Sequence, residues 1–207
     1  MAKTKDCSNI YIWYDTEFSS LDMNEARLMQ VAAVITDHTL TRILPAERDL
    51  NLCVALPDGA KCSAWVNQHL QPLVQQCRSD AALSLAEINS QFAAYIDAAV
   101  GEPTSDKSKR PLLAGNSLQC DLQLAHRDLP DIVDRVHYRV VDVSSWKMVW
   151  QNSYKQAPFD KSTHSNIARY FPGEYNSAEG AHDAHFDVLA SIAELNFYLQ
   201  HLALTSA

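Results

Sequence analysis

The sequence lacks the features that would place the protein in a membrane or outside the cell. No run approaches the roughly 20 consecutive apolar residues that a membrane-spanning helix needs. Residues 1–9 contain no apolar segment, so we expect neither a secretory nor a transit signal. The chain also has no internal repeat and no low-complexity tract. We therefore expect a protein without membrane association.

Cysteines and basic residues are both scarce. The five cysteines are an odd number without CxxC spacing, which predicts reduced thiols and a cytoplasmic location. Lys and Arg number 17 against 25 Asp and Glu, so the net charge is −8. Such a surface repels long nucleic acid. Any bound polyanion is therefore expected to be short or held through metal ions.

The 207 residues are 47% hydrophobic and 20% charged, which is typical of one globular domain. We expect a flexible N-terminus over residues 1–9, a single domain over 10–202 and a C-terminal tail over 203–207. Residues 101–110 are polar and lack periodicity. We interpret them as an exposed loop within the domain, because the segments on either side are each too small to fold alone.

The first part of the chain has the composition of β-strands. Runs of β-branched, aromatic and other apolar residues predict strands at 10–14, 28–36, 40–44 and 50–56. Loops of a few residues cannot join parallel neighbours. We therefore expect an antiparallel three-strand meander here.

The rest of the chain alternates helices with strands. Helical spacing predicts helices at 64–77, from the capping box at Ser84 to Gly101, and at 118–129, 145–151, 167–171 and 186–199. Short strands are expected at 111–114 and 138–143. Candidate N-caps are Ser63 and Ser144, and Pro72 is expected to interrupt its helix. This order predicts an α/β fold, a mixed sheet of antiparallel and parallel strands flanked by helices.

Acids and a histidine stand beside turns or element ends in three places. Asp15 and Glu17 are one residue apart, so on a strand both side chains point the same way. Asp121 opens a predicted helix, and His182 precedes Asp187 by five residues. An isolated Asp-x-Glu also ends strands for solubility alone. Whether Asp15 and Glu17 form a functional site therefore depends on Asp121, His182 and Asp187.

These blocks resemble the DEDDh family of 3′→5′ exonucleases, whose signature is Asp-x-Glu, a later Asp, and His-x4-Asp. The oligoribonuclease branch is matched most closely, through the segments 115–117, 137–139, 142–144 and 191–195. The resemblance implies a ribonuclease H-like fold. It further implies a homodimer that hydrolyses very short oligonucleotides, such as dinucleotides, to 5′-mononucleotides.

The chemistry of phosphodiester hydrolysis also calls for a group of carboxylates and a base. Two divalent ions stabilise the attacking and departing oxygens, and Mg²⁺ or Mn²⁺ prefers oxygen ligands. We assign Asp15, Glu17, Asp121 and Asp187 to the metal ions. We assign His182 as general base, because the pKa of imidazole lies near neutrality. A loop histidine without a role is the alternative. His185 is the competing base, although it lies only two residues before Asp187.

Six further residues match positions that contact substrate in this family. Two would bracket the bases: Leu21 and Trp65. Four would hold the 5′ phosphate, with the tyrosine contributed across the dimer interface: Ser117, Tyr138, Arg139 and Ser144. Base–aromatic stacking contributes roughly 1–3 kcal/mol.

Two alternative functions remain open. One is a DNA-directed or proofreading-type exonuclease of the same family, since short RNA and DNA oligonucleotides would use the same chemistry. The sequence departs from the family at Ser19-Ser20 and Leu122-Gln123, which leaves the preferred sugar and length undecided. The other alternative is a non-catalytic nucleotide-binding relative that keeps the fold.

Overall fold

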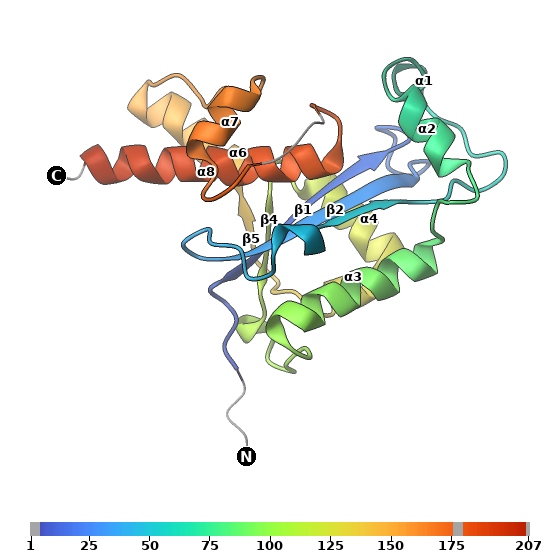
Figure 1. The fold of residues 1–207 in the computed structure, drawn as a ribbon, viewed down its shortest axis with the longest axis horizontal. Coiled ribbons are helices and arrows are strands. Elements are labelled where there is room, and N and C mark those ends of the chain that lie inside the picture. Colours follow the sequence, from blue (N-terminus) through green and yellow to red (C-terminus); the bar gives the residue numbers. More distant parts are fainter. Residues whose placement is uncertain (1–4, 176–179, 206–207) are drawn as a thin grey trace.

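A five-stranded mixed sheet forms the centre of the computed structural model, which describes residues 5–175 and 180–205 (Figure 1). Its order is β3-β2-β1-β4-β5. The first three strands pair antiparallel, and β4 and β5 add in parallel to β1. The predicted meander with added parallel strands is thus confirmed. The strands are β1 (Ile10–Phe18), β2 (Leu28–Asp37), β3 (Leu50–Cys53), β4 (Leu112–Gly115) and β5 (Val140–Asp142).

Helices cover both faces of this sheet (Figure 1). One face carries α3 (Leu85–Val100), α4 (Gln119–Asp128) and α5 (Pro130–Val133). The other carries α6 (Val143–Val149), α7 (His164–Tyr170) and α8 (Ala184–Thr205). Two short helices pack beside β2, α1 (Ala64–His69) and α2 (Gln71–Cys77). Single turns are η1 (Ala46–Arg48), η2 (Lys107–Lys109) and the π-helical η3 (Trp150–Tyr154).

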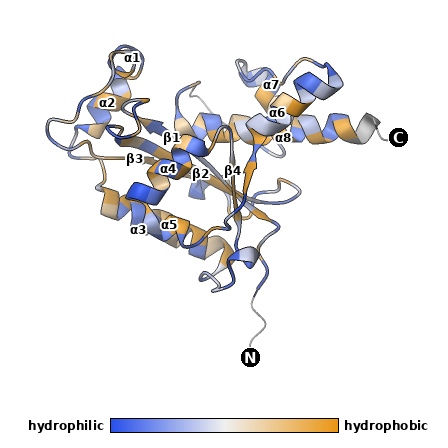
Figure 2. Cartoon of the chain, turned by 180° about the vertical axis from the view of Figure 1, so that it is seen from behind, coloured by the Kyte–Doolittle hydropathy of each residue, from blue (hydrophilic) through white to orange (hydrophobic). Residues whose placement is uncertain are grey.

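The central strand β1 is buried on both faces, which explains its continuous apolar run. Ile12 and Tyr14 pack with Phe92 of α3, whereas Trp13 packs with Leu189 of α8. Helices α3 and α8 carry both hydrophobic and hydrophilic residues along their length (Figure 2). Among the described helices, none is long and apolar enough to cross a bilayer.

Several predicted helix ends are observed. The side chain of Ser63 accepts the N–H of Val66 at 3.2 Å at the start of α1. At the start of α3, Ser84 and Glu87 form the predicted capping box, and Gly101 follows its end. The last helix extends beyond its predicted end, to Thr205. Residues 1–4 and 206–207 of the predicted terminal segments lie outside the described residues, as do 176–179.

Other local predictions were wrong. Residues 40–44 form no strand and make a single bridge, from Arg42 to Thr36. By contrast, the interruption expected at Pro72 is observed: the predicted helix over 64–77 is divided at Leu70, and the next helix begins with this proline in its first turn.

Ser144 does not cap the helix after β5. The carboxylate of Asp142 accepts the N–H of Ser144 at 2.8 Å, so Asp142 is the N-cap. Ser144 consequently belongs to the first turn of α6. The aspartate begins this helix two residues earlier than predicted because it satisfies a backbone N–H that would otherwise lack a partner.

Candidate active site

Strand β1 carries the first two predicted ligands. It continues through Asp15 and Glu17 to Phe18, paired with β2 along this length. Successive residues of a strand point to opposite faces and alternate residues to the same face, so both carboxylates lie on the side of β1 that also carries Trp13. The side chain of Trp13 packs among residues of α8. The strand therefore directs both carboxylates toward the face that α8 covers.

The turn before α8 supplies the histidine. His182 has a left-handed backbone with a φ of 70°, which is uncommon for a residue with a side chain. Its N–H donates to Oδ2 of Asp187 at 3.0 Å, which holds the turn against the first turn of the helix. One side-chain atom each from Glu17, His182 and Asp187 lie within 4.8 Å of one another. The structure thus brings these three predicted residues together.

The turn from β4 to α4 brings Asp121 to the same place. Strand β4 runs parallel to β1 and ends at Gly115. A Cβ at this glycine would lie 2.7 Å from the carbonyl oxygen of Tyr14, so a side chain would collide with the backbone of β1. Asp121 follows in the first turn of α4, is buried, and accepts a hydrogen bond from Thr16 Oγ1 at 2.5 Å.

The clustered carboxylates repel one another. Burial raises the pKa of Glu17 to about 8, and the charges of Asp187 and other acids add to the shift. Burial raises the pKa of Asp121 to about 6, although a hydrogen bond from Thr16 opposes the rise. Burial and then the charge of Asp121 raise the pKa of Asp15 well above its ordinary range. The surrounding protein therefore leaves this negative charge incompletely compensated.

This donor set fits a divalent cation. Carboxylate oxygens are the ligands that Mg²⁺ and Mn²⁺ prefer. Among the ion pairs of the described residues, one cation meets a predicted ligand: the ammonium of Lys161 lies 3.5 Å from Oδ1 of Asp187. Divalent ions would provide the missing positive charge and remove the repulsion that raises the pKa values.

A pocket of about 530 Å³ opens beside the carboxylates. Glu17 and His182 line it together with Leu21 and Trp65. Leu21 is 85% exposed and Trp65 is 45% exposed. The Trp65 ring stands edge-on to the His182 imidazole, with 4.9 Å between ring centroids. Two exposed apolar side chains beside a cluster of acids offer a surface on which a base can stack.

Ser117 and Ser144 also come together. Their hydroxyl oxygens are 2.9 Å apart, and Asp142 accepts the backbone N–H of each, at 3.1 and 2.8 Å. The Ser144 hydroxyl donates to Oδ1 of Asn116 at 3.1 Å. Gly115 stands opposite Asp142 in the parallel pairing of β4 and β5. The residues that follow both strands therefore meet at one edge of the sheet.

Tyr138 and Arg139 contact each other instead of joining this pair. The guanidinium carbon of Arg139 lies 5.3 Å from the centroid of the Tyr138 ring. Among the described residues, no hydrogen bond connects the Arg139 side chain to Ser117 or Ser144. The tyrosine is 65% exposed. The structure thus brings together the two serines of the predicted phosphate site, but not the arginine.

Two residues near the site were missed from the sequence. Thr16 stands between the two acids of β1, and its position within Asp-x-Glu was the available signal. Lys161 lies in an irregular segment where no local pattern marks it. His185, the competing base, contacts Oδ2 of Asp49 through Nε2 at 3.0 Å. Its imidazole therefore meets a carboxylate outside the predicted set.

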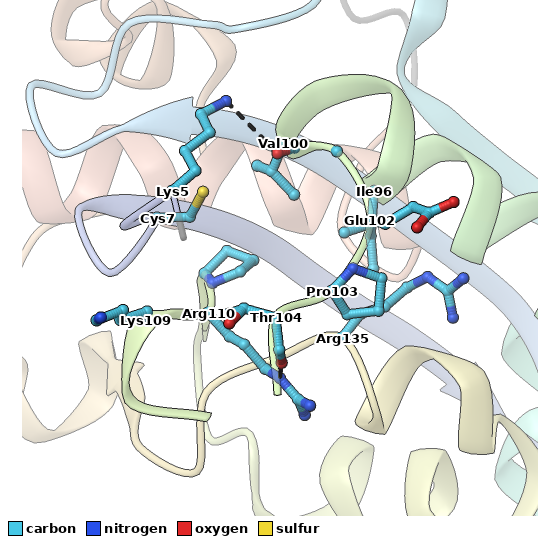
Figure 3. Close-up of a pocket in the computed structure, with 12 residues that line it drawn as sticks. Lys5, Cys7, Ile96, Val100, Glu102, Pro103, Thr104, Lys109, Arg110 and Arg135 are labelled. Atoms are coloured by element: carbon cyan, nitrogen blue, oxygen red, sulfur yellow. Dashed lines mark hydrogen bonds between the residues drawn. The ribbon is translucent and has the colours of Figure 1, made fainter. Parts of the chain in front are cut away.

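A second pocket, of about 240 Å³, lies near the start of β1 (Figure 3). The ammonium of Lys5 donates to the carbonyl of Val100 at 3.4 Å at its edge. The side chains of Lys109 and Arg135 point in opposite directions (Figure 3). No predicted site residue lines this pocket, so we assign it no part in the candidate site.

The mixed sheet thus carries acids at the end of its central strand, close to a histidine and an acid from the turn into α8. A sequence-family model named RNase_T and described as exonuclease matches residues 12–195. Because the match spans most of the chain, the protein belongs to the RNase_T exonuclease family. The resemblance seen in the sequence is thereby confirmed.

Curated relatives include several oligoribonucleases. The chain is 32% identical over 197 residues to the oligoribonuclease of Streptomyces coelicolor, covering 90% of this chain and 84% of that protein. It is 28% identical over 194 residues to an oligoribonuclease of Francisella tularensis, covering 92% and 94%. A probable oligoribonuclease of Schizosaccharomyces pombe is 29% identical over 192 residues, which span 90% of this chain and 66% of the relative.

Solved structures share the fold at low sequence identity. Exonuclease I from Methylocaldum szegediense superposes with a TM-score of 0.67 at 17% identity, covering 94% of this chain and 41% of that chain. Cell-death related nuclease 4 superposes with a TM-score of 0.61 at 13% identity, covering 98% and 66%. These likenesses confirm the predicted fold class.

Proposed function

We propose that the protein is a metal-dependent 3′→5′ exoribonuclease that hydrolyses very short oligonucleotides, down to dinucleotides, to 5′-mononucleotides. One observation carries the proposal: side-chain atoms of Glu17, Asp187 and His182 lie within 4.8 Å of one another, and Glu17 and His182 also line the pocket that contains Trp65. Acids, a base and a stacking surface therefore meet at one point. The names of the oligoribonuclease relatives agree with this assignment.

Each residue of the site takes one role in the reaction. Asp15, Glu17, Asp121 and Asp187 hold two divalent ions, which when bound stabilise charge on the attacking and departing oxygens. His182 accepts a proton from the attacking water, whose oxygen bonds to phosphorus while the bond to the 3′ oxygen breaks. The departing 3′ oxygen takes up a proton from solvent. Neutral imidazole suits this role at neutral pH.

The substrate-binding residues divide between base and phosphate. Trp65 and Leu21 hold the terminal base in the pocket beside Glu17. Ser117 and Ser144 hold the 5′ phosphate of the substrate, and Arg139 reaches it by leaving its contact with Tyr138. A charged contact at a fixed distance from the metal ions selects for a short substrate. A few local contacts of this kind suit a chain whose net charge is −8.

A homodimer forms part of the proposal. Tyr138 is exposed beside the edge strand β5, and Trp146, Met148 and Val149 of α6 are also large apolar side chains in contact with solvent. A second copy that covers this surface would bring Tyr138 to its phosphate site. Light scattering coupled to gel filtration tests the mass. A cytoplasmic location is also part of the proposal, because an odd number of cysteines without CxxC spacing is typical of a reducing compartment.

The test compares RNA and DNA of increasing length. The purified chain is incubated with Mn²⁺ and 5′-labelled oligonucleotides of two to about twenty residues, at substrate concentrations below saturation. We expect dinucleotides to be hydrolysed fastest and RNA to be preferred. Equal rates on long strands would refute the length preference, and faster cleavage of DNA would favour the DNA-directed alternative. Undiminished hydrolysis by Asp121→Ala would refute the assigned site.

A further inference from the structure

Lys161 is held beside the carboxylates by the segment that carries it. Phe159, two residues earlier, is buried and packs against Phe197 of α8 with 5.5 Å between ring centroids. The carboxylate of Asp160 accepts the N–H of Ser162 at 2.9 Å, and its carbonyl accepts from Asn166. Residues on both sides of Lys161 are therefore fixed. Its ammonium lies 3.5 Å from Oδ1 of Asp187.

Stability alone does not account for this ion pair. The Lys161 side chain is 41% exposed and that of Asp187 is 14% exposed. A partly exposed pair of this kind contributes little to folding, because solvent screens the attraction and the lysine loses conformational freedom. The lysine nevertheless acts on more than one acid. Burial and the neighbouring acids raise the pKa of Asp15, and the charge of Lys161 opposes that rise.

The net charge of the proposed complex would be negative, so one more cation would stabilise it. The four negative charges of the carboxylates equal the four positive charges of two divalent ions, and the phosphodiester adds one negative charge. Further charge develops on the attacking and departing oxygens in the transition state. Metal ions bound to Asp187 would take over the oxygen that the ammonium of Lys161 now contacts, which would leave this ammonium available to a phosphate bound at the same carboxylates.

We infer that Lys161 is a further catalytic residue, whose ammonium contacts an oxygen of the scissile phosphate and stabilises the charge that develops during hydrolysis. This inference rests on the proposed function, because it requires metal ions and a phosphodiester at the four carboxylates. The lysine makes and breaks no covalent bond and transfers no proton. Its contribution is electrostatic and is greatest in the transition state.

The experiment removes or keeps the charge at this position in the full-length chain. Lys161→Met removes the charge and keeps most of the length of the side chain, and Lys161→Arg keeps the charge. Lys155→Met is the matched control, since Lys155 is exposed on the same segment. For each protein, kcat and KM are measured on a labelled RNA dinucleotide at saturating Mn²⁺. Calorimetry measures Mn²⁺ affinity without substrate.

We expect kcat of Lys161→Met to fall about 10- to 100-fold, less than for a fully buried donor because solvent screens the charge. Lys161→Arg should recover part of the loss, and Lys155→Met should match the wild type. Mn²⁺ affinity of Lys161→Met should stay equal or increase, because the ammonium competes with the ion for Asp187.

Two results would overturn the inference. One is an unchanged kcat for Lys161→Met. The other is a weakened Mn²⁺ affinity with kcat restored at high Mn²⁺, which would show that the lysine only arranges the ligand. A melting temperature close to that of the wild type verifies folding of each variant. If the wild-type protein itself hydrolyses no oligonucleotide with Mn²⁺, the proposed function fails, and the failure is distinct from that of the lysine.

Discussion

Helix α8 carries two acids with opposite surroundings. Asp187, in the first turn, lies beside Glu17 and a partly exposed lysine. Glu194 is two turns further along the same helix and only 2% exposed. Its two oxygens accept hydrogen bonds from Nδ2 of Asn116 at 3.0 Å and from the hydroxyl of Tyr198 at 2.8 Å. One carboxylate thus faces other acids, and the other faces donors.

The difference separates a proposed metal ligand from a structural carboxylate. Glu194 can only accept hydrogen bonds when ionised, so the amide nitrogen of Asn116 must face it. The amide oxygen of Asn116 then faces Ser144, whose hydroxyl donates to it at 3.1 Å. A buried carboxylate that is satisfied in this way fixes the geometry around it. Among the described residues, Asp187 accepts from the backbone N–H of His182 and from the ammonium of Lys161, but its side chain also lies within 4.8 Å of that of Glu17. We therefore expect its cluster to depend on added cations.

The largest expected effect is the loss of activity in Asp187→Asn. This change keeps the size of the side chain and removes the charge of a proposed metal ligand. A bound cation contributes several kcal/mol to the transition state, so we expect kcat/KM to fall about a thousandfold or more. The melting temperature without metal should stay equal or rise, because repulsion with Glu17 is relieved. Steady-state kinetics and thermal melts measure the two quantities.

The opposite pattern would contradict this distinction. Near-normal activity together with a marked drop in melting temperature would make Asp187 a structural acid. Isothermal titration of Mn²⁺ provides the control, since the Asn variant should bind the ion more weakly than the wild type.

Glu194→Ala should show the reverse pattern, in which stability falls more than activity. The change removes the buried acceptor of the Tyr198 hydroxyl and of one N–H of Asn116 Nδ2, which keeps its other contact with Oγ of Ser191. Each unsatisfied group costs about 1–3 kcal/mol, so we expect a loss of about 2–4 kcal/mol. For a chain of this size the melting temperature should fall by about 5–12 °C. Urea unfolding followed by circular dichroism provides the free energy.

Glu194→Gln is the matched variant, because its amide oxygen can still accept from Asn116. It should lose less than half as much stability as the Ala variant. Equal losses in the two variants would mean that packing rather than hydrogen bonding stabilises this position.

The sequence predicts which residues form the candidate site better than it predicts what those residues contact. The Asp-x-Glu pair, Asp121 and the acid of the last helix follow from local pattern, and their resemblance to exonucleases supplied the link between them. The capping box at Ser84 was also readable, because its two hydrogen bonds are local. The antiparallel meander was expected because short loops exclude parallel pairing, although the connection from β2 to β3 runs over residues 38–49.

Contacts between residues that are far apart in the chain could not be predicted from the sequence. The approach of Lys161 to Asp187 depends on a buried Phe159 that anchors an irregular segment, and no periodicity reports such an anchor. The partners of Glu194 come from α8 itself and from the turn after β4, 78 positions away in the case of Asn116. Residues 40–44 have strand composition but pair only once, because tertiary context overrides local propensity.

Stability of the metal-free protein should fall as pH rises. The folded pKa of Glu17, about 8, exceeds its ordinary value of 4.5. The folded state therefore binds this proton more tightly, and the resulting stability is fully present below pH 4.5 and is lost as pH rises through 8. Asp121 contributes in the same direction, between 3.8 and about 6.

Thermal melts in EDTA and in Mn²⁺ measure this effect. Between about pH 6 and about pH 8.5 we expect the melting temperature in EDTA to fall by about 4 °C or more. Mn²⁺ should remove most of that fall, because the ion binds the ionised carboxylates. A fall of equal size with and without Mn²⁺ would show that other groups cause it. Asp187→Asn should have a smaller fall in EDTA than the wild type.

The smallest expected effect is that of His185→Ala, a change in the first turn of α8 that is compared with His182→Ala. Its Nε2 contacts Oδ2 of Asp49 at 3.0 Å, away from the assigned set of ligands. His185→Ala should therefore keep kcat within about twofold and lose about 1 kcal/mol of stability, the worth of one hydrogen bond. His182→Ala, by contrast, should lower kcat about 100-fold or more, because the general base is lost. Comparable losses of kcat in both variants would remove the grounds for choosing His182 as the base.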